Sequence, residues 1–151
     1  MAGVKSITQS DSFTSAYFKT FLERIEPILA NETVAIVYDY PCSQAALSEI
    51  QCGLAKRVEF YVHGVELSNG FRECVDFQEN LKRFSDINLV RNLEGFETPE
   101  SDPLFFKALR DGIPPCCGNA LGVDRWLALL LGHNSLDQVI PFRNSGIYSH
   151  S

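Results

Sequence analysis

Three glutamates of this sequence have a spacing that could bring their carboxylates together. Glu59 and Glu66 would share one face of a β-hairpin turning at residues 63–64, because side chains alternate along a strand. If residues 69–70 form a second hairpin turn, Glu73 lies opposite Glu66. If the strand instead continues through a one-residue bulge, the change of phase brings Glu73 to the same face. Both alternatives predict three converging carboxylates.

Converging carboxylates repel one another unless a cation or an ammonium group lies among them. Their oxygens suit Mg²⁺ that also binds phosphates. The alternative is an amphipathic hairpin whose polar face only meets water. That polar face would carry Glu59, Tyr61, Glu66 and Ser68, and the opposite face would carry Phe60, Val62, Val65 and Leu67.

A second candidate site is the stretch 112–125, with the sequence GIPPCCGNALGVDR. Its prolines and glycines indicate a turn, and the strongly apolar residues 121–131 predict a buried helix. Gly118 and Gly122 would flank the helix entry, where a flat ligand could approach free backbone N–H groups. Arg125, in the first turn, could stack on a base or bind a phosphate. The alternative is that Arg125 pairs with a carboxylate.

This stretch resembles the third signature motif of class II aminoacyl-tRNA synthetases in its lysyl form. It is most similar to the elongation factor P–(R)-β-lysine ligase family, which carries alanine where the synthetases carry glycine, here Ala120. The resemblance implies that Arg125 is catalytic and that it binds ATP together with Gly118 and Gly122. It also implies that Ala120 contacts the substrate.

The segment EFYVHGVELSNGFRE, residues 59–73, resembles the part of the family that precedes this motif. The resemblance implies that Glu59 and Glu66 bind Mg²⁺ with ATP. It further implies that Asn69 and Glu73 hold the lysine-like substrate. Under this interpretation the carboxylates of the hairpin form a metal site and an amine site.

The string PCSQAAL, residues 41–47, resembles a substrate-side signature of the ligase family. It implies that Ser43 and Gln44 contact the substrate. Cys42 stands where alanine is usual in the family. We expect Cys42 to be a small buried side chain without a chemical role.

The implied function is ATP-dependent activation of lysine or β-lysine as an adenylate, followed by transfer to a lysine of elongation factor P. The resemblance covers about residues 17–142, the C-terminal part of the family's catalytic domain. The family's first two motifs are not identified in the sequence, so we expect incomplete catalysis. The alternative is a non-catalytic truncated paralogue that binds a lysine-like amino acid or a partner chain. A tRNA-charging synthetase fragment is disfavoured by Ala120, and no direct tRNA contact is expected.

The elements that would position these residues form an α/β (α+β) architecture, with an antiparallel sheet and flanking helices. It would correspond to the C-terminal part of a class II synthetase core. A buried strand is predicted over 34–38, ending before Pro41. Helices are predicted by their apolar spacing and capping residues over 13–30, 43–51, 76–90 and 104–112.

The length of 151 residues favours one domain. We expect a partial catalytic domain over 13–142 between flexible termini, 1–12 and 143–151. The net charge of −6 and the lack of a basic run with interleaved aromatic residues give no support to nucleic-acid binding. No apolar run reaches the length of a membrane span, so no membrane partner is expected.

The five cysteines are odd in number, and two of them, Cys116 and Cys117, are adjacent. This pattern is a poor disulfide framework and lacks the spacing of zinc ligands. We therefore expect reduced thiols, no zinc and a cytoplasmic location. A sheet that lacks strands would expose an apolar edge, which predicts a homo-oligomer or a complementing chain.

Overall fold

The computed structural model describes residues 4–141, in which helices and strands are mixed. The helical elements are α1 (Phe13–Thr20), η1 (Phe21–Ile25), α2 (Glu26–Asn31), η2 (Cys42–Gln44), α3 (Phe77–Leu93), α4 (Pro103–Asp111), α5 (Val123–Leu130) and η3 (Leu136–Gln138). The strands are β1 (Val34–Pro41), β2 (Ile50–Gln51), β3 (Leu54–Val62), β4 (Val65–Arg72) and β5 (Cys117–Leu121).

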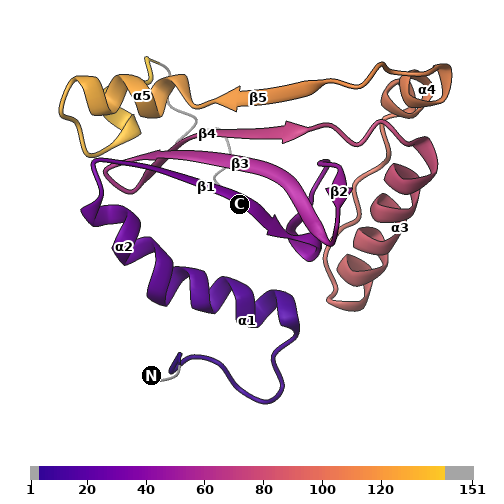
Figure 1. Ribbon diagram of the computed structural model, residues 1–151, viewed down its shortest axis with the longest axis horizontal. Helices are drawn as coiled ribbons and strands as arrows, with labels where there is room; N and C mark the ends of the chain where they lie inside the picture. Colours follow the sequence, from indigo (N-terminus) through magenta and orange to yellow (C-terminus); the bar gives the residue numbers. More distant parts are fainter. Residues whose placement is uncertain (1–3, 142–151) are drawn as a thin grey trace, which may run out of the picture. The chain divides into compact units, whose positions relative to one another are not determined.

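The strands of the described residues form one sheet with the order β1-β3-β4-β5, and β2 is hydrogen-bonded to β3 (Figure 1). β2 and β3 run antiparallel, with Ile50 opposite Ala55 and Gln51 opposite Leu54. The sheet is antiparallel and has flanking helices. The predicted α/β (α+β) class is therefore confirmed.

The chain divides into two compact units. Unit 1 contains the described residues of 1–37, 59–69 and 119–151, and unit 2 contains residues 38–58 and 70–118. The boundaries cut across the long strands, so each of these strands contributes to both units. Glu59, Glu66, Asn69 and Arg125 belong to unit 1, and Glu73 and Gly118 belong to unit 2.

The hairpin of β3 and β4 turns at residues 63–64, as the alternation predicted. His63 has a φ of 48° and Gly64 a φ of 75°, and two successive positive values are typical of a type I′ turn. A Cβ at Gly64 would lie 2.8 Å from Cα of Ala30, so a larger residue does not fit there. β4 continues through residues 69–70 to Arg72, which excludes the second hairpin turn and leaves the continuing strand.

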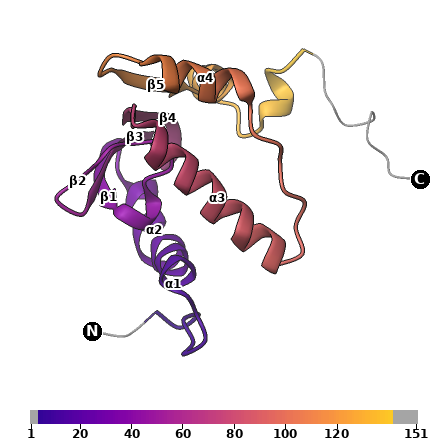
Figure 2. The ribbon, with the colours of Figure 1, turned by 90° about the vertical axis from the view of Figure 1, so that its right-hand side faces the viewer.

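The helix predicted over 13–30 is a continuous helical segment made of α1, η1 and α2 (Figures 1 and 2). Ser12 is its N-cap, because Oγ of Ser12 accepts a hydrogen bond from the amide of Ser15 at 3.1 Å. The segment is π-helical at η1, just before Pro27, whose missing N–H removes one α-helical hydrogen bond. The sequence pattern predicted the helix but not this change of geometry.

The other two long helices are also confirmed. The helix predicted over 76–90 is α3, which continues three residues further, and Asp76 caps it by accepting from the amide of Glu79 at 2.7 Å. The helix predicted over 104–112 is α4, and Asp102 caps it in the same way. In both cases an aspartate satisfies amides that have no partner within the helix.

The short helix predicted over 43–51 is wrong. Only η2 is helical there, and the segment ends in the strand β2. Ser48, in its middle, is fully buried and donates through Oγ to the carbonyl of Ala45 at 2.7 Å. The amide of Glu49 donates to the carbonyl of Arg72 at 2.7 Å, so pairing with β4 replaces helical hydrogen bonds. The strand predicted to end before Pro41 in fact includes it, at the last position, where a missing N–H costs little.

The buried helix predicted over 121–131 differs from the structure in two ways. It begins at Val123 after the N-cap Gly122, and most of its large apolar side chains are exposed, Trp126 by 48% and Leu130 by 68%. Ala128 is its buried residue. Its apolar composition thus predicted a helix correctly but its burial wrongly. No helix within residues 4–141 is both long enough and apolar enough to span a membrane.

The predicted flexible C-terminus, 143–151, lies outside the described residues, as do the first three residues of the predicted flexible N-terminus, 1–12. In the described part of the N-terminal segment, Asp11 accepts two hydrogen bonds of 2.8 Å from the ammonium of Lys19 on α1. This ammonium lowers the pKa of Asp11 well below its ordinary value. The predicted domain boundaries are not tested by these contacts and stay predictions.

Candidate active site

In unit 1, the carboxylate of Glu59 is buried within the hairpin, with only 5% of the residue exposed. The hydroxyl of Tyr61 donates to Oε2 of Glu59 at 2.5 Å, and Nδ2 of Asn69 donates to Oε1 at 2.9 Å. Each carboxylate oxygen therefore has a donor, which offsets the cost of burial. The alternative in which this face only meets water is wrong for Glu59 and Tyr61, both of which are buried.

Asn69 brings Glu59 and Glu66 onto one face of the hairpin. Its Nδ2 also lies 3.3 Å from Oε1 of Glu66. Residues 66 and 69 are an odd number of positions apart, so regular alternation would place them on opposite faces. Their side chains nevertheless meet, and the predicted bulge at residues 69–70 stays a prediction. An amide that donates to both carboxylates also reduces the repulsion between them.

Arg125 lies in the first turn of α5, as predicted, and contacts β4. Its Nη1 donates to the backbone carbonyl of Glu66 at 2.9 Å and lies 3.7 Å from Oε2 of the same residue. The alternative that this arginine meets a carboxylate therefore holds in the structure. The side chain of Arg125 is still 49% exposed, so other parts of the guanidinium can reach a ligand. Ala120 precedes this turn in β5 and is exposed.

Gly122, the N-cap of α5, joins the start of this helix to β4. Its amide donates to the carbonyl of Leu67 at 2.8 Å. A Cβ at Gly122 would lie 3.3 Å from Cδ of Arg125 and 3.5 Å from that carbonyl. The first distance is tight and the second is an ordinary contact, so the missing side chain mainly leaves room for the side chain of Arg125.

This cluster in unit 1 fits a metal that is shared with phosphates. Mg²⁺ is commonly held by one or two carboxylates plus substrate phosphates, and Glu59 and Glu66 provide two. Within residues 4–141, no three His, Cys, Asp or Glu side chains form a complete metal site. A Mg²⁺ ion would therefore need oxygens from a ligand such as ATP. Arg125 could bind the same phosphates, because its planar guanidinium forks onto two oxygens.

In unit 2, the backbone of Glu73 contacts the segments around Ser48 and Cys116, and the residue lines a cavity of about 250 Å³. Its amide donates to the carbonyl of Cys116 at 3.0 Å, and it forms a β-bridge with Ser48. Gly118 lies in β5, so the expectation that it flanks the helix entry is wrong. A Cβ at Gly118 would lie only 2.3 Å from Oε1 of Glu73. Gly118 therefore leaves room for this carboxylate.

The segment 42–44 also belongs to unit 2, and its residues have different surroundings. Gln44 is buried, and its backbone carbonyl accepts a 3.1 Å hydrogen bond from Nη1 of Arg57. Ser43 is exposed. Cys42 is also exposed, so the expectation of a buried side chain is wrong. A 3₁₀ turn explains this, because three residues of η2 cannot all face the core.

All five cysteines carry free thiols in the structure. Cys116 and Cys117 are both exposed, and Cys74 is partly buried. The hydrogen bond from Tyr61 to Glu59 was not predicted, although the spacing of the two residues in the sequence indicates it. Tyr61 is two residues from Glu59 on the same strand face, which is the spacing at which a hydroxyl can reach a carboxylate.

Residues 16–145 match the family model described as tRNA synthetases class II (D, K and N). This match covers most of the chain, and the chain therefore belongs to the class II tRNA synthetase family. The antiparallel sheet with flanking helices agrees with this assignment.

Within this family, the sequence is similar to proteins named elongation factor P–(R)-β-lysine ligase, which confirms the resemblance. It is 40% identical to the protein of Pasteurella multocida over 137 residues, 89% of this chain and 42% of that protein. It is 38% identical to the protein of Buchnera aphidicola over 90% of this chain and 43% of that protein. It is 42% identical to the protein of Vibrio atlanticus over 78% of this chain and 38% of that protein. The chain thus spans about two fifths of the length of these curated relatives.

Proposed function

We propose that this chain supplies ATP-, Mg²⁺- and amine-binding residues to a ligase that activates lysine or β-lysine and transfers it to elongation factor P. The observation that carries the proposal is the cluster of Glu59, Glu66, Asn69 and Arg125 in unit 1. These are positions to which the family resemblance assigns metal, amine and ATP binding. The names of the relatives support the amino acid and the acceptor.

The proposed reaction has two steps. The carboxylate of the amino acid attacks the α-phosphorus of ATP, a new O–P bond forms, and pyrophosphate leaves. The ε-amine of the acceptor lysine then attacks the carbonyl of the adenylate. An amide bond forms, AMP leaves, and the amine loses a proton to solvent. Both steps build negative charge on oxygens, which cationic groups and hydrogen-bond donors stabilise.

The residues of unit 1 would bind and orient ATP. Glu59 is held by two donors, and this preorganises its carboxylate. Together with Glu66 it would bind Mg²⁺, which would neutralise charge on the phosphates. Arg125 would hold the nucleotide through the exposed part of its guanidinium. Gly122 supports this role because its missing side chain leaves room for the side chain of Arg125.

The resemblance assigns amine binding to Glu73, in unit 2, and separately to Asn69, in unit 1. A carboxylate suits the ammonium of a lysine-like substrate, and such a charge-assisted hydrogen bond contributes about 1.5–3 kcal/mol. Gly118 has a supporting role beyond the expected contact with ATP, since its missing side chain accommodates Glu73. We assign Ser43, Gln44 and Ala120 to the substrate side on the resemblance alone.

A direct test is ATP–pyrophosphate exchange by the purified chain, with lysine and with β-lysine. We expect weak amino-acid binding but no useful rate of exchange, because no arginine of the family's second motif is identified. Losing one such charge contact typically costs about 10²–10³ in rate. Robust exchange that is lost in Arg125→Ala and kept in Arg91→Ala would show that this chain carries the chemistry unaided.

A second candidate function is binding without catalysis, as in a truncated paralogue. One observation favours it. The arginines on the strands of residues 4–141 are both engaged in structural contacts in unit 2. Arg57 lies 4.7 Å from the ring centre of Tyr40, and Arg72 is 2.8 Å from a carboxylate oxygen of Glu49. In these contacts, neither arginine is available to bind a phosphate. The chain would then bind a lysine-like amino acid or a partner chain.

The exposed apolar side chains of α5 support an association with a second copy or a complementing chain. Light scattering over a range of concentrations tests this. We expect a mass that rises with concentration, and Leu130→Gln should lower it while Leu93→Gln, exposed on α3, should not. A stable monomer at all concentrations would contradict the proposal. The cytoplasmic location suggested by the cysteines stays a prediction.

A further inference from the structure

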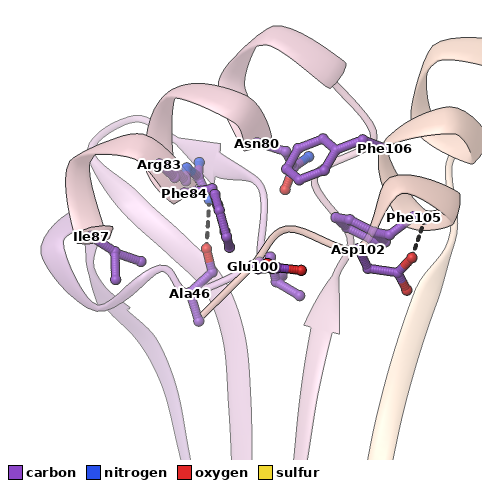
Figure 3. Close-up of a pocket in the computed structure, with 10 residues that line it drawn as sticks. Ala46, Asn80, Arg83, Phe84, Ile87, Glu100, Asp102, Phe105 and Phe106 are labelled. Atoms are coloured by element: carbon purple, nitrogen blue, oxygen red, sulfur yellow. Dashed lines mark hydrogen bonds between the residues drawn. The ribbon is translucent and has the colours of Figure 1, made fainter. Parts of the chain in front are cut away.

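A cavity of about 510 Å³ lies within unit 2, between α3, α4 and the segment that precedes β2 (Figure 3). Its volume falls in the range of small-molecule sites. Its walls are mostly apolar and include the aromatic rings of Phe84, Phe105 and Phe106. The proposed function does not use this cavity.

Asn80 forms part of the wall and has an acceptor without a donor. The residue is only 3% exposed. Its Nδ2 donates to the carbonyls of Cys74 at 2.6 Å and Asp76 at 2.8 Å, and these bonds define the orientation of the amide. Its Oδ1 is buried and has no hydrogen-bond partner among the described residues. Such a buried oxygen is unusual because it loses water without gaining a donor.

The charged groups at the cavity favour a cation. Glu100 is exposed and makes no hydrogen bond or ion pair with the described residues. Asp102 has its carboxylate directed to the amides that begin α4. The cation of the wall, Arg83, is already engaged by Glu79 at 2.8 Å and by the carbonyl of Ser48 at 2.7 Å. The groups left for a ligand are therefore acceptors.

The aromatic wall also suits a cation with an apolar body. The ring centre of Phe106 lies 5.8 Å from that of Phe84 and 5.4 Å from that of Phe105, in edge-on arrangements. Edge-on rings leave aromatic faces for a ligand, and these faces attract positive charge. Figure 3 shows these rings around the same space as Asn80 and Glu100.

We propose that this cavity binds a small organic ammonium ion with an aromatic body. The body packs on the phenylalanines, and the ammonium donates to Glu100 and, once bound, to Oδ1 of Asn80. Leu47, Asn80 and Phe105 also line the smaller cavity of Glu73, so the two cavities adjoin, but Glu73 itself does not line this one. The proposed binding needs neither ATP nor Mg²⁺. The inference therefore stands apart from the proposed function.

The test is NMR titration of the full chain with 2-phenylethylamine, without ATP. We expect saturable shifts in the side-chain amide of Asn80 and the rings of the wall. 3-Phenylpropionate has the same body with the opposite charge, and n-butylamine has the charge without the ring. Both should bind at least about fivefold more weakly. Equal binding of 3-phenylpropionate would overturn the proposal, as would the absence of saturable shifts.

Variants locate the bound amine. Glu100→Gln should weaken 2-phenylethylamine about three- to fivefold, whereas Glu97→Gln, an exposed carboxylate outside the cavity, should not. Phe105→Leu should weaken it by removing ring area. Glu73→Gln should leave the affinity for 2-phenylethylamine unchanged. A loss of affinity in that variant would assign the binding to the amine site of Glu73 and overturn the proposal. A titration with N-acetyl-lysine methylamide, which mimics a lysine side chain of a protein, tests whether the ligand is a free small amine. If this compound binds more tightly than 2-phenylethylamine, the proposed small-amine ligand is wrong.

Discussion

The hydroxyl of Tyr61 donates a 2.5 Å hydrogen bond to Oε2 of Glu59, and both residues point to the buried face of β3. Asn69 on β4 donates to the other oxygen of the same carboxylate. The buried Glu59 is thus held from both strands of the hairpin. This arrangement links the stability of the hairpin to the orientation of a proposed metal ligand.

Tyr61→Phe should destabilise the chain by about 1–3 kcal/mol, because a buried carboxylate oxygen loses its donor. The free energy of unfolding in urea measures the effect. Tyr38→Phe is the matched control, since Tyr38 is 69% exposed and should change stability by less than about 0.5 kcal/mol. Equal effects of the two substitutions would contradict the role assigned to Tyr61.

Gly118→Ala should displace the carboxylate of Glu73 and weaken lysine binding about tenfold or more. Calorimetry with lysine measures the affinity. If the effect passes through Glu73, the double variant Gly118→Ala, Glu73→Ala should bind no worse than Glu73→Ala alone. Additive losses in the double variant would show that Gly118 acts by another route.

Arg125→Ala should weaken ATP binding about tenfold while leaving lysine binding nearly intact. Glu73→Gln should weaken lysine binding while leaving ATP binding nearly intact. Two equilibrium titrations of each variant, one with ATP and one with lysine, separate the two roles. Arg91→Ala controls for the loss of a cation, because Arg91 donates to the carbonyl of Glu97 and lies 5.9 Å from the ring centre of Phe96, outside both proposed sites. Loss of lysine binding in Arg125→Ala would contradict this division.

The contact of Asp11 with Lys19 should make the N-terminal segment sensitive to acid. The ammonium of Lys19, with donors from Thr8 and Ser15, lowers the pKa of Asp11 from its ordinary value of 3.8. A carboxyl whose pKa is lowered by folding stabilises the fold fully above the unfolded pKa, and this stabilisation is lost as the pH falls towards the folded pKa. We therefore expect the contact of the segment with α1 to weaken progressively as the pH falls below about 3.8.

The amide of Thr8, which donates to Oδ2 of Asp11 at 2.7 Å, reports this change. Its NMR shift should move as the pH falls below the ordinary carboxyl pKa, and Asp11→Asn should abolish the movement. Glu97→Gln, remote in sequence, should not alter it. A Thr8 shift that is independent of pH in the unsubstituted chain would contradict the linkage.

Local patterns determined much of the fold and part of the site. Alternation and a permissive turn pair at residues 63–64 were enough for the β3–β4 hairpin, because strand periodicity is a local property. Caps and apolar spacing likewise predicted α1, α3 and α4. The motif around Arg125 placed this residue in a first helical turn, because an apolar run that follows a glycine is compatible with a helix whose N-cap is that glycine.

The tertiary structure decided what each element contacts. Pairing of Glu49 with Arg72 drew the segment before β2 into the sheet, although its sequence favours a helix. The burial of Glu59 depends on donors from Tyr61 and from the neighbouring strand, and no pattern in one strand reports a partner across the sheet. Gly118 adjoins Glu73, 45 positions away by number, and only folding brings a missing side chain next to the carboxylate that occupies its space. Propensity acts between near neighbours in the chain, whereas burial and close contact depend on segments that are distant in sequence.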